Sequence, residues 1–321
     1  MAAPTGTFQT YQAVGNREDL TDVITDISPM ERPFSTRVRR GKASATFHEF
    51  QTDSLAAASK SNAVIDGDDA TTDTATATSR YGNYCQIMDR VARVSGTQRV
   101  VNSAGRRDEM SYQVAKRGRE LLRDVERRLC SDDAASAGSA ALARELAGVG
   151  AWLWDNQVQK GGLATTVTVT SGAPTTDPTA GSAGTFTEAN LKTAIEATWN
   201  DGGNADLILV GSFNKQRASA FGGIATQYRD NQQIGPGVII ASADIYVSDF
   251  GQHSIIASHF TENDIVYALD TEHWEVCYLR GIRQQQLAKT GDSDRRQIIT
   301  EVTLEACEPK ANAKIYTTTT S

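Results

Sequence analysis

The chain has 321 residues, which is enough for about two compact units at the usual size of a domain. Its 26 glycines, 7 prolines and 22% of charged residues are ordinary for a globular protein, so a collagen-like chain, wholesale disorder and a short disulfide-stapled peptide are excluded. The net charge of −7 has the wrong sign for a protein whose whole surface coats nucleic acid, but it leaves room for local basic patches.

The four cysteines are widely spaced and form no CxxC pair, which argues against a ladder of zinc ligands and indicates reduced thiols. The N-terminus lacks the basic start and apolar run of a secretory signal. The most apolar window, Val238 to Val247, is about half as long as a membrane-spanning helix. We therefore expect no membrane partner and no secretion by the usual route. The cysteines are Cys85, Cys130, Cys277 and Cys307.

Charge is unevenly distributed along the chain. Residues 1–130 carry 19 Lys and Arg against 17 Asp and Glu, whereas residues 131–321 carry 13 against 22, so the first part is the candidate for anionic partners. Within it, a short helix is predicted at Arg17–Ile27, ending before the prolines of SPMERP. Its apolar stripe needs a partner surface, and consists of Leu20, Val23, Ile24 and Ile27.

Two extended segments, Ala45–Gln51 and Tyr84–Val94, surround a polar stretch, Thr52–Ser79, that is poor in large apolar residues. This pattern predicts a long projecting hairpin. Because an isolated two-stranded ribbon buries too little surface to be stable in water, we expect neighbouring copies to support it, and we interpret it as an assembly element outside the folding core.

A long helix is predicted from a cap at Asn102 or Ser103 to Cys130. Gly118 lies within its apolar stripe, which suggests a close approach to the backbone there. On the other side a basic row is partly offset by acidic residues, so either ion pairs within the helix or an anion-facing side explains it. The apolar stripe is Met110, Val114, Leu121, Val125 and Leu129; the basic row is Lys116, Arg119, Arg123 and Arg127; the acidic residues are Glu120, Asp124 and Glu126.

A second unit begins after residues 131–186, a segment rich in small residues in which we expect Trp152 and Trp154 to be buried. The sequence predicts a helix at Thr187–Trp199 capped by Thr187, a central strand at Leu207–Val210 and a half-buried edge strand at Ile298–Ala306. Further elements are a helix near Lys215–Phe221 and strands near Val238–Val247, Ser254–Ala257, Ile265–Ala268 and Trp274–Leu279.

Motifs for chemistry are incomplete. HEFQT at His48 starts like the zinc-protease motif but has Thr52 at the second ligand position, so we interpret His48 as a packed or surface histidine. DGDD at Asp66–Asp69 lacks the glycine and distal glutamate of a calcium loop. No nucleophile elbow and no phosphate-cradling glycine loop occurs. We predict no catalytic residue, no cofactor and no metal, and favour a structural assembly protein over an enzyme.

The run DVITDISPMERPFSTRVRRGKASATFHEFQTDSL, Asp22 to Leu55, resembles the N-terminal signature of a family of tailed-bacteriophage major capsid proteins, with Phe50 where Trp is common. The order of elements is similar to that of the Hong Kong 97-type capsid fold. The resemblance implies an α+β protein with an N-terminal arm (1–40), an extended loop (41–94), a peripheral domain (95–186) containing a spine helix (103–130) and an inserted loop region, an axial domain (187–268), and returning peripheral strands with a C-terminal tail (269–321).

The resemblance further implies a virion protein, assembled in the host cytoplasm, that forms pentamers and hexamers of an icosahedral shell around double-stranded DNA, with portal, scaffolding or decoration proteins as further partners. Alternatives are an encapsulin-like cellular compartment and an unrecognised enzyme with its site in the loop Gly222–Gly237. The expected DNA-facing residues are Arg119, Arg123 and Arg127; the expected axial-loop contacts are Gln227, Tyr228, Arg229, Asp230 and Gln232; the expected arm contacts between subunits are Leu20, Val23, Ile24 and Ile27.

Overall fold

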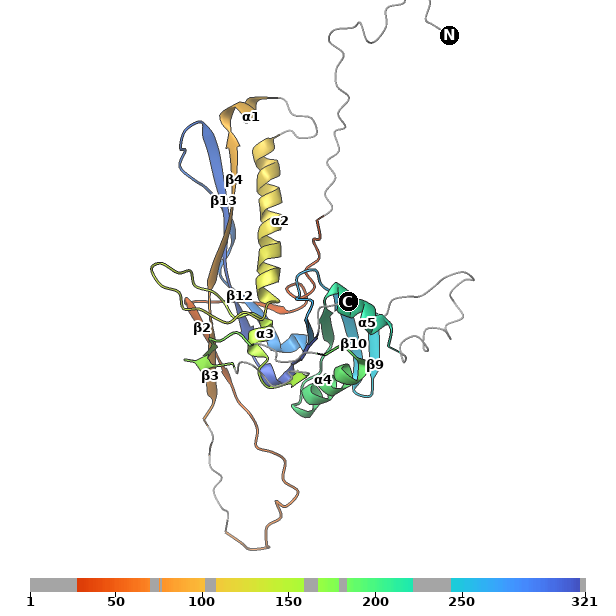
Figure 1. Ribbon diagram of the computed structural model, residues 1–321. Helices are drawn as coiled ribbons and strands as arrows, with labels where there is room; N and C mark the ends of the chain where they lie inside the picture. Colours follow the sequence, from red (N-terminus) through yellow and green to blue (C-terminus); the bar gives the residue numbers. More distant parts are fainter. Residues whose placement is uncertain are drawn as a thin grey trace, which may run out of the picture.

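Two sheets and one long helix organise the protein (Figure 1). The computed structural model describes residues 28–69, 75, 77–101, 108–158, 167–178, 184–221 and 244–317. The first sheet, called the long sheet below, has four strands in the order β1 (Arg39–Lys42), β12 (Trp274–Gln286), β13 (Ser293–Ala306) and β4 (Gln86–Ser95).

Helix α2 (Glu109–Leu129) lies along β4 of the long sheet (Figure 1). It begins later than the expected Ser103, because Asp108 is its cap and accepts hydrogen bonds from the backbone N–H groups of Met110 and Ser111 at 3.1 and 3.3 Å. The predicted apolar stripe is confirmed, since four of its members are buried and Val114 packs beside them. The close approach expected at Gly118 is absent from the described residues, where its missing Cβ faces open space.

The second sheet has six strands and carries helices α4 (Glu188–Asn200) and α5 (Ser212–Ser219). The helix predicted from Thr187 is confirmed, with the Thr187 hydroxyl accepting from the Asn190 N–H. The central position of Leu207–Val210 is also confirmed. The strand order is β5 (Gln157–Val158), β14 (Ala313–Tyr316), β11 (Ile265–Leu269), β8 (Leu207–Val210), β10 (Gly251–Ala257) and β9 (Ile245–Ser248).

The expected boundaries at residues 187 and 268 are not boundaries of this second sheet. Strand β14, from the predicted C-terminal peripheral segment, pairs with β11, and β5, from the predicted peripheral domain, pairs with β14. Both additions are short strands whose partners lie far along the chain, so no local pattern reveals them. The six-stranded sheet therefore draws on segments from three of the expected ranges.

Strand β13 contradicts the edge position predicted for Ile298–Ala306, because it lies between β12 and β4. Successive side chains of β13 alternate between its two faces, as in any strand. The face that would be exposed to solvent on an edge strand is covered by other residues of the protein. Glu301, on the face that a half-buried edge strand would turn to solvent, is 3% exposed and accepts hydrogen bonds from Arg144 at 2.8 Å and Arg280 at 2.6 Å. Two guanidinium groups compensate the burial of its charge.

The projecting hairpin consists of β2 (Phe47–Thr52) and β3 (Ser79–Tyr84), paired from Phe47 with Tyr84 to Thr52 with Ser79. The expected second arm, Tyr84–Val94, is wrong, because the chain leaves the hairpin at Cys85 and continues as β4 in the long sheet. The remaining elements are short: α1 (Gly96–Val100), α3 (Val149–Trp152), β6 (Val169–Thr170), β7 (Ala173–Pro174), and 3-10 turns at Thr271–His273 and Pro309–Ala311.

The core is shared between the sheets because β8, β11 and β14 of the six-stranded sheet are buried on both faces. Leu207 and Leu209 of β8 join a core with α2, the long sheet and Trp152, whereas Ile208 and Val210 join a second core with α4. This is the alternation that a period of two imposes on a doubly covered strand.

A buried ion pair connects β14 to the segment after α2. Lys314, fully buried, donates to Asp132 Oδ1 and to the carbonyl of Gly150, both at 2.8 Å. Burial raises the pKa of Asp132 to about 6, opposed by the nearby ammonium group, and burial likewise lowers the pKa of Lys314. Each charge therefore depends on the other to remain in this site.

Candidate assembly surfaces

The tip of the hairpin, defined as residues 53–78, projects from the body in the direction away from α1 (Figure 1). Every residue of the tip that the structure describes is exposed. Three large apolar side chains are among them, Leu55 at 97% exposure, Val64 at 82% and Ile65 at 79%. Apolar side chains held this far out of the body have nothing in their own subunit to pack against, and such surface is typical of a binding site for another protein.

The base of the hairpin, defined as β2 and β3, is packed against the body by aromatic rings. Phe50 is 8% exposed and lies 5.6 Å from the ring of Trp152 and 6.4 Å from that of Tyr81. Trp152 in turn lies 5.8 Å from Trp154. The burial expected for the two tryptophans is confirmed for Trp152, while Trp154 is half-buried. This aromatic cluster therefore fixes the base of the hairpin to the body of the subunit.

Asn83 of β3 fixes the same base by hydrogen bonds and is fully buried. Its Oδ1 accepts from the Ala147 N–H at 2.8 Å, and its Nδ2 donates to the carbonyls of Ala147 at 3.1 Å and Leu304 at 2.9 Å. One side chain thus satisfies backbone groups of a loop and of β13, which would otherwise be buried without partners.

His48 of β2 lies beside β13, where its Nε2 is 2.9 Å from Glu305 Oε2. The interpretation of His48 as a packed histidine agrees with its 16% exposure. The hydrogen bond from His48 is the main cause that lowers the pKa of Glu305. The thiol of Cys277 lies 3.7 Å from the same carboxylate oxygen, and burial, followed by Glu305 and Glu275, raises its pKa to about 12. This cluster of titratable groups was not anticipated from the sequence.

The base of the N-terminal arm is held by α2. The Glu126 carboxylate, 0% exposed, accepts from the backbone N–H groups of Phe34 at 2.8 Å and Ser35 at 3.0 Å. The Phe34 ring is also fully buried and meets Trp274 edge-on with centroids 6.0 Å apart. Part of the sequence signature, ERPF, is thus anchored on the body, and the pairing of Glu126 with the backbone replaces the intrahelical ion pair expected for it.

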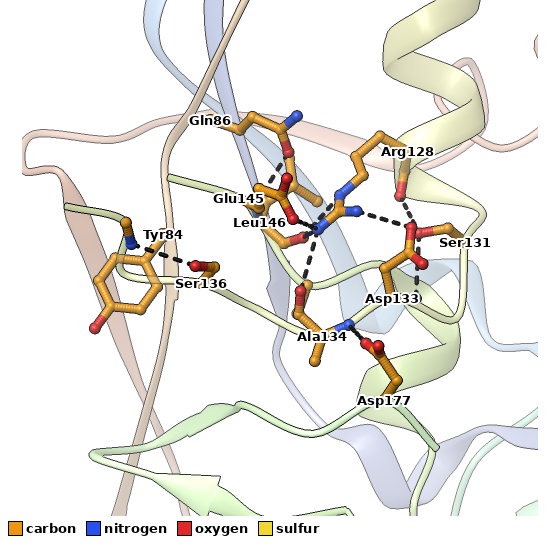
Figure 2. Close-up of polar contacts among 12 residues, drawn as sticks. Tyr84, Gln86, Arg128, Ser131, Asp133, Ala134, Ser136, Glu145, Leu146 and Asp177 are labelled. Atoms are coloured by element: carbon orange, nitrogen blue, oxygen red, sulfur yellow. Dashed lines mark hydrogen bonds and ion pairs between the residues drawn. The ribbon is translucent and has the colours of Figure 1, made fainter. Parts of the chain in front are cut away.

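Arg128, in the last turn of α2, organises the loop that follows the helix (Figure 2). Its guanidinium donates to the carbonyl of Leu146 from Nε at 3.0 Å and from Nη2 at 2.7 Å, and to the carbonyl of Ala134 at 3.1 Å. Nη1 contacts Asp133 at 2.7 Å, and Asp177 accepts from the Ala134 N–H at 2.6 Å. The loop carrying Ala147, the partner of Asn83, is therefore anchored on the helix.

The three expected DNA-facing arginines do not share one environment. Arg127 donates to the Phe260 carbonyl at 2.8 Å and to Glu262 at 3.0 Å, and burial raises the pKa of Glu262 despite this arginine. The Arg123 guanidinium lies 5.8 Å from the centroid of the Phe260 ring. Arg119 is exposed on α2. Of the acidic residues expected to pair with this row, Glu120 contacts Arg117 and Asp124 contacts Arg90 of β4.

Two sets of expected contacts lie outside the described residues, and so does the helix expected at Arg17–Ile27. The arm set comprises Leu20, Val23, Ile24 and Ile27, and the axial-loop set comprises Gln227, Tyr228, Arg229, Asp230 and Gln232.

Further exposed apolar side chains lie at the two ends of the described structure. At the α1 end Val100 is 86% exposed. On the six-stranded sheet Trp199 and Phe250, 57% and 38% exposed, stack at 5.2 Å beside the edge strand β9, on which Val247 is 51% exposed. Exposed apolar surface is thus spread over three separate regions, the hairpin tip, α1 and the six-stranded sheet, as expected of a subunit with several neighbours.

Sequence reasoning missed Asn83, Glu126 and Arg128, the side chains that hold the hairpin base, the base of the N-terminal arm and the loop after α2. The available signal was the placement of Glu126 between Val125 and Leu129, where a carboxylate shares the buried side of a helix and needs a partner. The sequence does not indicate which group pairs with Glu126, because the partner is a backbone segment 92 residues away.

The arrangement of a long helix against a long sheet, a second unit and a projecting hairpin is that of tailed-phage capsid proteins. The capsid asymmetric unit of cyanophage A-1(L) is similar with a TM-score of 0.66 at 12% identity, covering 97% of this chain and 99% of that chain. A structure from Gordonia phage Cozz has a TM-score of 0.58 at 12% identity, covering 98% and 97%. These likenesses establish the Hong Kong 97-type α+β fold predicted from the sequence.

The chain belongs to the SU10 major capsid protein family, whose model matches residues 3–320. It is also 26% identical over 351 residues to the major capsid protein of Escherichia phage Phieco32, covering 99% of this chain and 98% of that protein. The expected function is thereby confirmed: the protein is a tailed-phage major capsid protein that forms the capsid shell of a virion, and its family is structural and not enzymatic. Nothing favours a cellular compartment or an enzyme. Among the described residues, no helix is long and apolar enough to cross a membrane.

Proposed function

We propose that this capsid protein assembles into pentamers and hexamers of an icosahedral shell, in which the hairpin tip of each subunit lies across a neighbouring subunit. The observation that carries the proposal is the contrast within one hairpin: a base fixed by Phe50 and Asn83, and a tip on which Leu55 is 97% exposed. Because the base is fixed to the body, the tip projects in a set direction toward a neighbouring subunit. The apolar side chains of the tip supply contact area, and the symmetry of the shell repeats this contact between neighbouring subunits.

The proposed roles of the other regions follow the same division. The long sheet and α2 form the peripheral domain, the six-stranded sheet with α4 and α5 forms the axial domain, and the loop 222–237 lies around the five-fold and six-fold axes. The exposed pair Trp199 and Phe250 supports the use of the six-stranded unit as a contact surface.

We further propose that the shell encloses double-stranded DNA, assembles in the host cytoplasm, and turns Arg119, Arg123 and Arg127 toward the interior. The exposure of Arg119 on α2 supports this placement, and the contact of Arg127 with Glu262 reduces the charge that Arg127 offers to phosphate. Each exposed contact to phosphate is worth about 1 kcal/mol and weakens with salt. A map of the particle with these side chains on the outer surface would overturn this role. Portal, scaffolding or decoration proteins are the further partners proposed; a structure of phage G capsids with decoration proteins, at a TM-score of 0.53, supports the last of these.

The decisive experiment replaces residues 53–78 with a short Gly/Ser turn that keeps the pairing of Thr52 with Ser79. We expect a cooperatively folding subunit, followed by thermal unfolding, that sediments without forming shells. A matched control replaces residues 139–143, an exposed loop in which Leu142 is 69% exposed, and is expected to form shells. Normal shells from the first variant would contradict the role of the tip, and an unfolded chain would contradict its independence from the core.

A further inference from the structure

His48, Cys277 and Glu305 converge at the base of the hairpin from three strands, β2, β12 and β13. Their candidate donor atoms all lie within 4.8 Å of one another. Glu305 Oε2 is 2.9 Å from His48 Nε2 and 3.7 Å from Cys277 Sγ. Zinc bonds of about 2.0–2.3 Å in tetrahedral geometry place donor atoms roughly 3.5 Å apart, so small side-chain movements bring the three donors to coordinating positions.

The surroundings of this cluster favour a cation. Glu275 lies directly opposite Glu305 in the β12–β13 register, and its Oε1 is 3.9 Å from Cys277 Sγ. Like charges directly opposite on paired strands are destabilising unless something compensates them. His48 contacts Glu305, and Arg39 lies opposite Glu275 and 3.5 Å from Cys307 Sγ, so part of this charge is already compensated, and a divalent ion would compensate it further. Thr303, opposite Cys277, carries a buried hydroxyl for which the described residues provide no hydrogen-bond partner.

The backbone leaves room for this arrangement at one position of β1. Gly41 pairs with Cys277 in the register, and a Cβ at residue 41 would stand 1.9 Å from Glu275 Oε1 and 2.8 Å from Cys277 Sγ. Any side chain here would displace the carboxylate and the thiol. A fourth donor is also near, since Cys307 Sγ lies 3.6 Å from Glu305 Oε1.

We propose that His48, Cys277 and Glu305 form a zinc site that ties the base of the hairpin to the long sheet. The donor set of one imidazole, one thiolate and one carboxylate suits Zn²⁺ and is poorly suited to Mg²⁺ or Ca²⁺, which prefer oxygen ligands alone. On binding, Zn²⁺ replaces the hydrogen bond between His48 Nε2 and Glu305 Oε2: the neutral imidazole carries its one proton on Nδ1, so that Nε2 is free to bind the ion. The bond to sulfur forms as the thiol proton is released to solvent, so that the thiolate and the carboxylate balance the two charges of the ion. The site lies within one subunit and does not depend on the proposed role of the tip.

The test is metal binding by the full chain, stripped with a chelator and kept in a non-thiol reductant. Titration with Zn²⁺ is expected to show one tight equivalent per chain, and Co²⁺ is expected to give the thiolate-to-cobalt charge-transfer band of a sulfur ligand. Cys277→Ser and His48→Gln should each weaken binding at least ~100-fold, since loss of even an outer-shell partner costs about 10–100-fold. Cys130→Ala, which removes a buried thiol at the end of α2, is the matched control and should bind like the parent.

Two results would overturn the site. One is a parent chain that takes up no equivalent of either metal; the other is binding that survives in both His48→Gln and Cys277→Ser, which would identify adventitious surface binding only. If Cys277→Ser fails to fold, His48→Gln decides, because His48 lies at the edge of the body and its replacement leaves the thiol in place. Metal content measured in assembled shells and in free subunits separates this proposal from the proposed assembly contacts.

Discussion

The base and the tip belong to one hairpin but differ in burial. At the base, Phe50 is 8% exposed within an aromatic cluster, and Asn83 is completely enclosed. Five residues after Phe50, Leu55 is 97% exposed, and every described residue of the tip is exposed. The base contributes to the stability of the subunit, whereas the tip can contribute only after another molecule covers it.

This difference separates the stability of the folded subunit, to which the base contributes, from the free energy of assembly, to which the tip contributes. Burial of apolar surface is worth about 25 cal/mol per Å², and ordering a residue costs about 1–2 kcal/mol. The tip buries almost nothing within its own subunit, so contacts with neighbours must supply what orders it. The comparison predicts that substitutions in the base lower subunit stability and that substitutions in the tip lower shell formation.

The largest effect is expected at Phe50. Phe50→Ala should lower the free energy of unfolding of the subunit by about 3–5 kcal/mol, because it opens a cavity beside Trp152. Leu55→Ala, the matched control in the tip, should change it by less than about 0.5 kcal/mol. Denaturant unfolding measures both. Equal effects of the two substitutions would show that base and tip are not energetically distinct.

Asn83→Ala should lower the free energy of unfolding of the subunit by about 2–4 kcal/mol, somewhat less than Phe50→Ala. The substitution leaves the Ala147 N–H and the Leu304 carbonyl buried without partners, and each unsatisfied group costs about 1–3 kcal/mol. Asn62→Ala, at an exposed position of the tip, is the control and should have no measurable effect on unfolding. Hydrogen exchange at Ala147 provides a second measurement, since its protection should fall in the first variant alone.

Acid should weaken the base through Glu305, in protein kept free of metal with a chelator. Because its pKa is lowered from the usual 4.5, chiefly by the hydrogen bond from His48, the stability it contributes is complete above pH 4.5 and disappears as the pH falls through the lowered value. His48→Leu should therefore lower the free energy of unfolding by about 1.5 kcal/mol at neutral pH. The difference in stability between the parent and this variant should shrink toward pH 3.

Unfolding of the parent and His48→Leu across that pH range tests the expectation. Glu49→Gln, which removes a neighbouring exposed ion pair with Arg80, serves as the control and should shift stability by less than about 1 kcal/mol. A difference between parent and His48→Leu that stays constant down to pH 3 would rule out a role for the Glu305 carboxylate.

The smallest effect on the subunit is expected from replacing Leu55, Val64 and Ile65 of the tip together with serine. Unfolding should change by less than about 0.5 kcal/mol, since these side chains are exposed, whereas the yield of sedimenting shells should fall sharply. Serine at Ala56, Ala57 and Ala58 is the matched control and should assemble. Undiminished assembly of the apolar-to-serine variant would mean that the tip contacts its neighbours through other groups.

Elements that depend on local signals were predictable from the sequence. Thr187 carries the side-chain cap that starts α4, and the unbroken apolar run Leu207–Val210 is a central strand, because both signals are complete within a few residues. The start of α2 was misplaced because Asn102, Ser103 and Asp108 are all residue types that cap helices, and the sequence alone does not show that Asp108 is the cap.

Pairings between distant segments were not predictable. Strand β4 alternates as a hairpin arm would, but its partner is β13, some 200 residues away, with Ser95 opposite Ser293. Glu301 was expected in solvent because a charged residue on an alternating strand usually faces water, yet Arg144 and Arg280 cover it. The candidate surfaces depend on the same long-range partners, so the projecting elements could be predicted but the side chains that fix their bases could not.

The parallel pairing of β1 with β12 limits how early during synthesis the chain can complete its long sheet. Arg39 lies opposite Glu275, so the strand nearest the N-terminus has no partner until most of the polypeptide has left the ribosome. Pairings this distant in sequence form slowly, because the loop must close before any contact stabilises it. The hairpin base, which also needs Glu305 and Leu304, completes at the same late stage. A chain that stops before β12 and β13 therefore lacks the partners that hold the hairpin base, and its tip has no fixed direction.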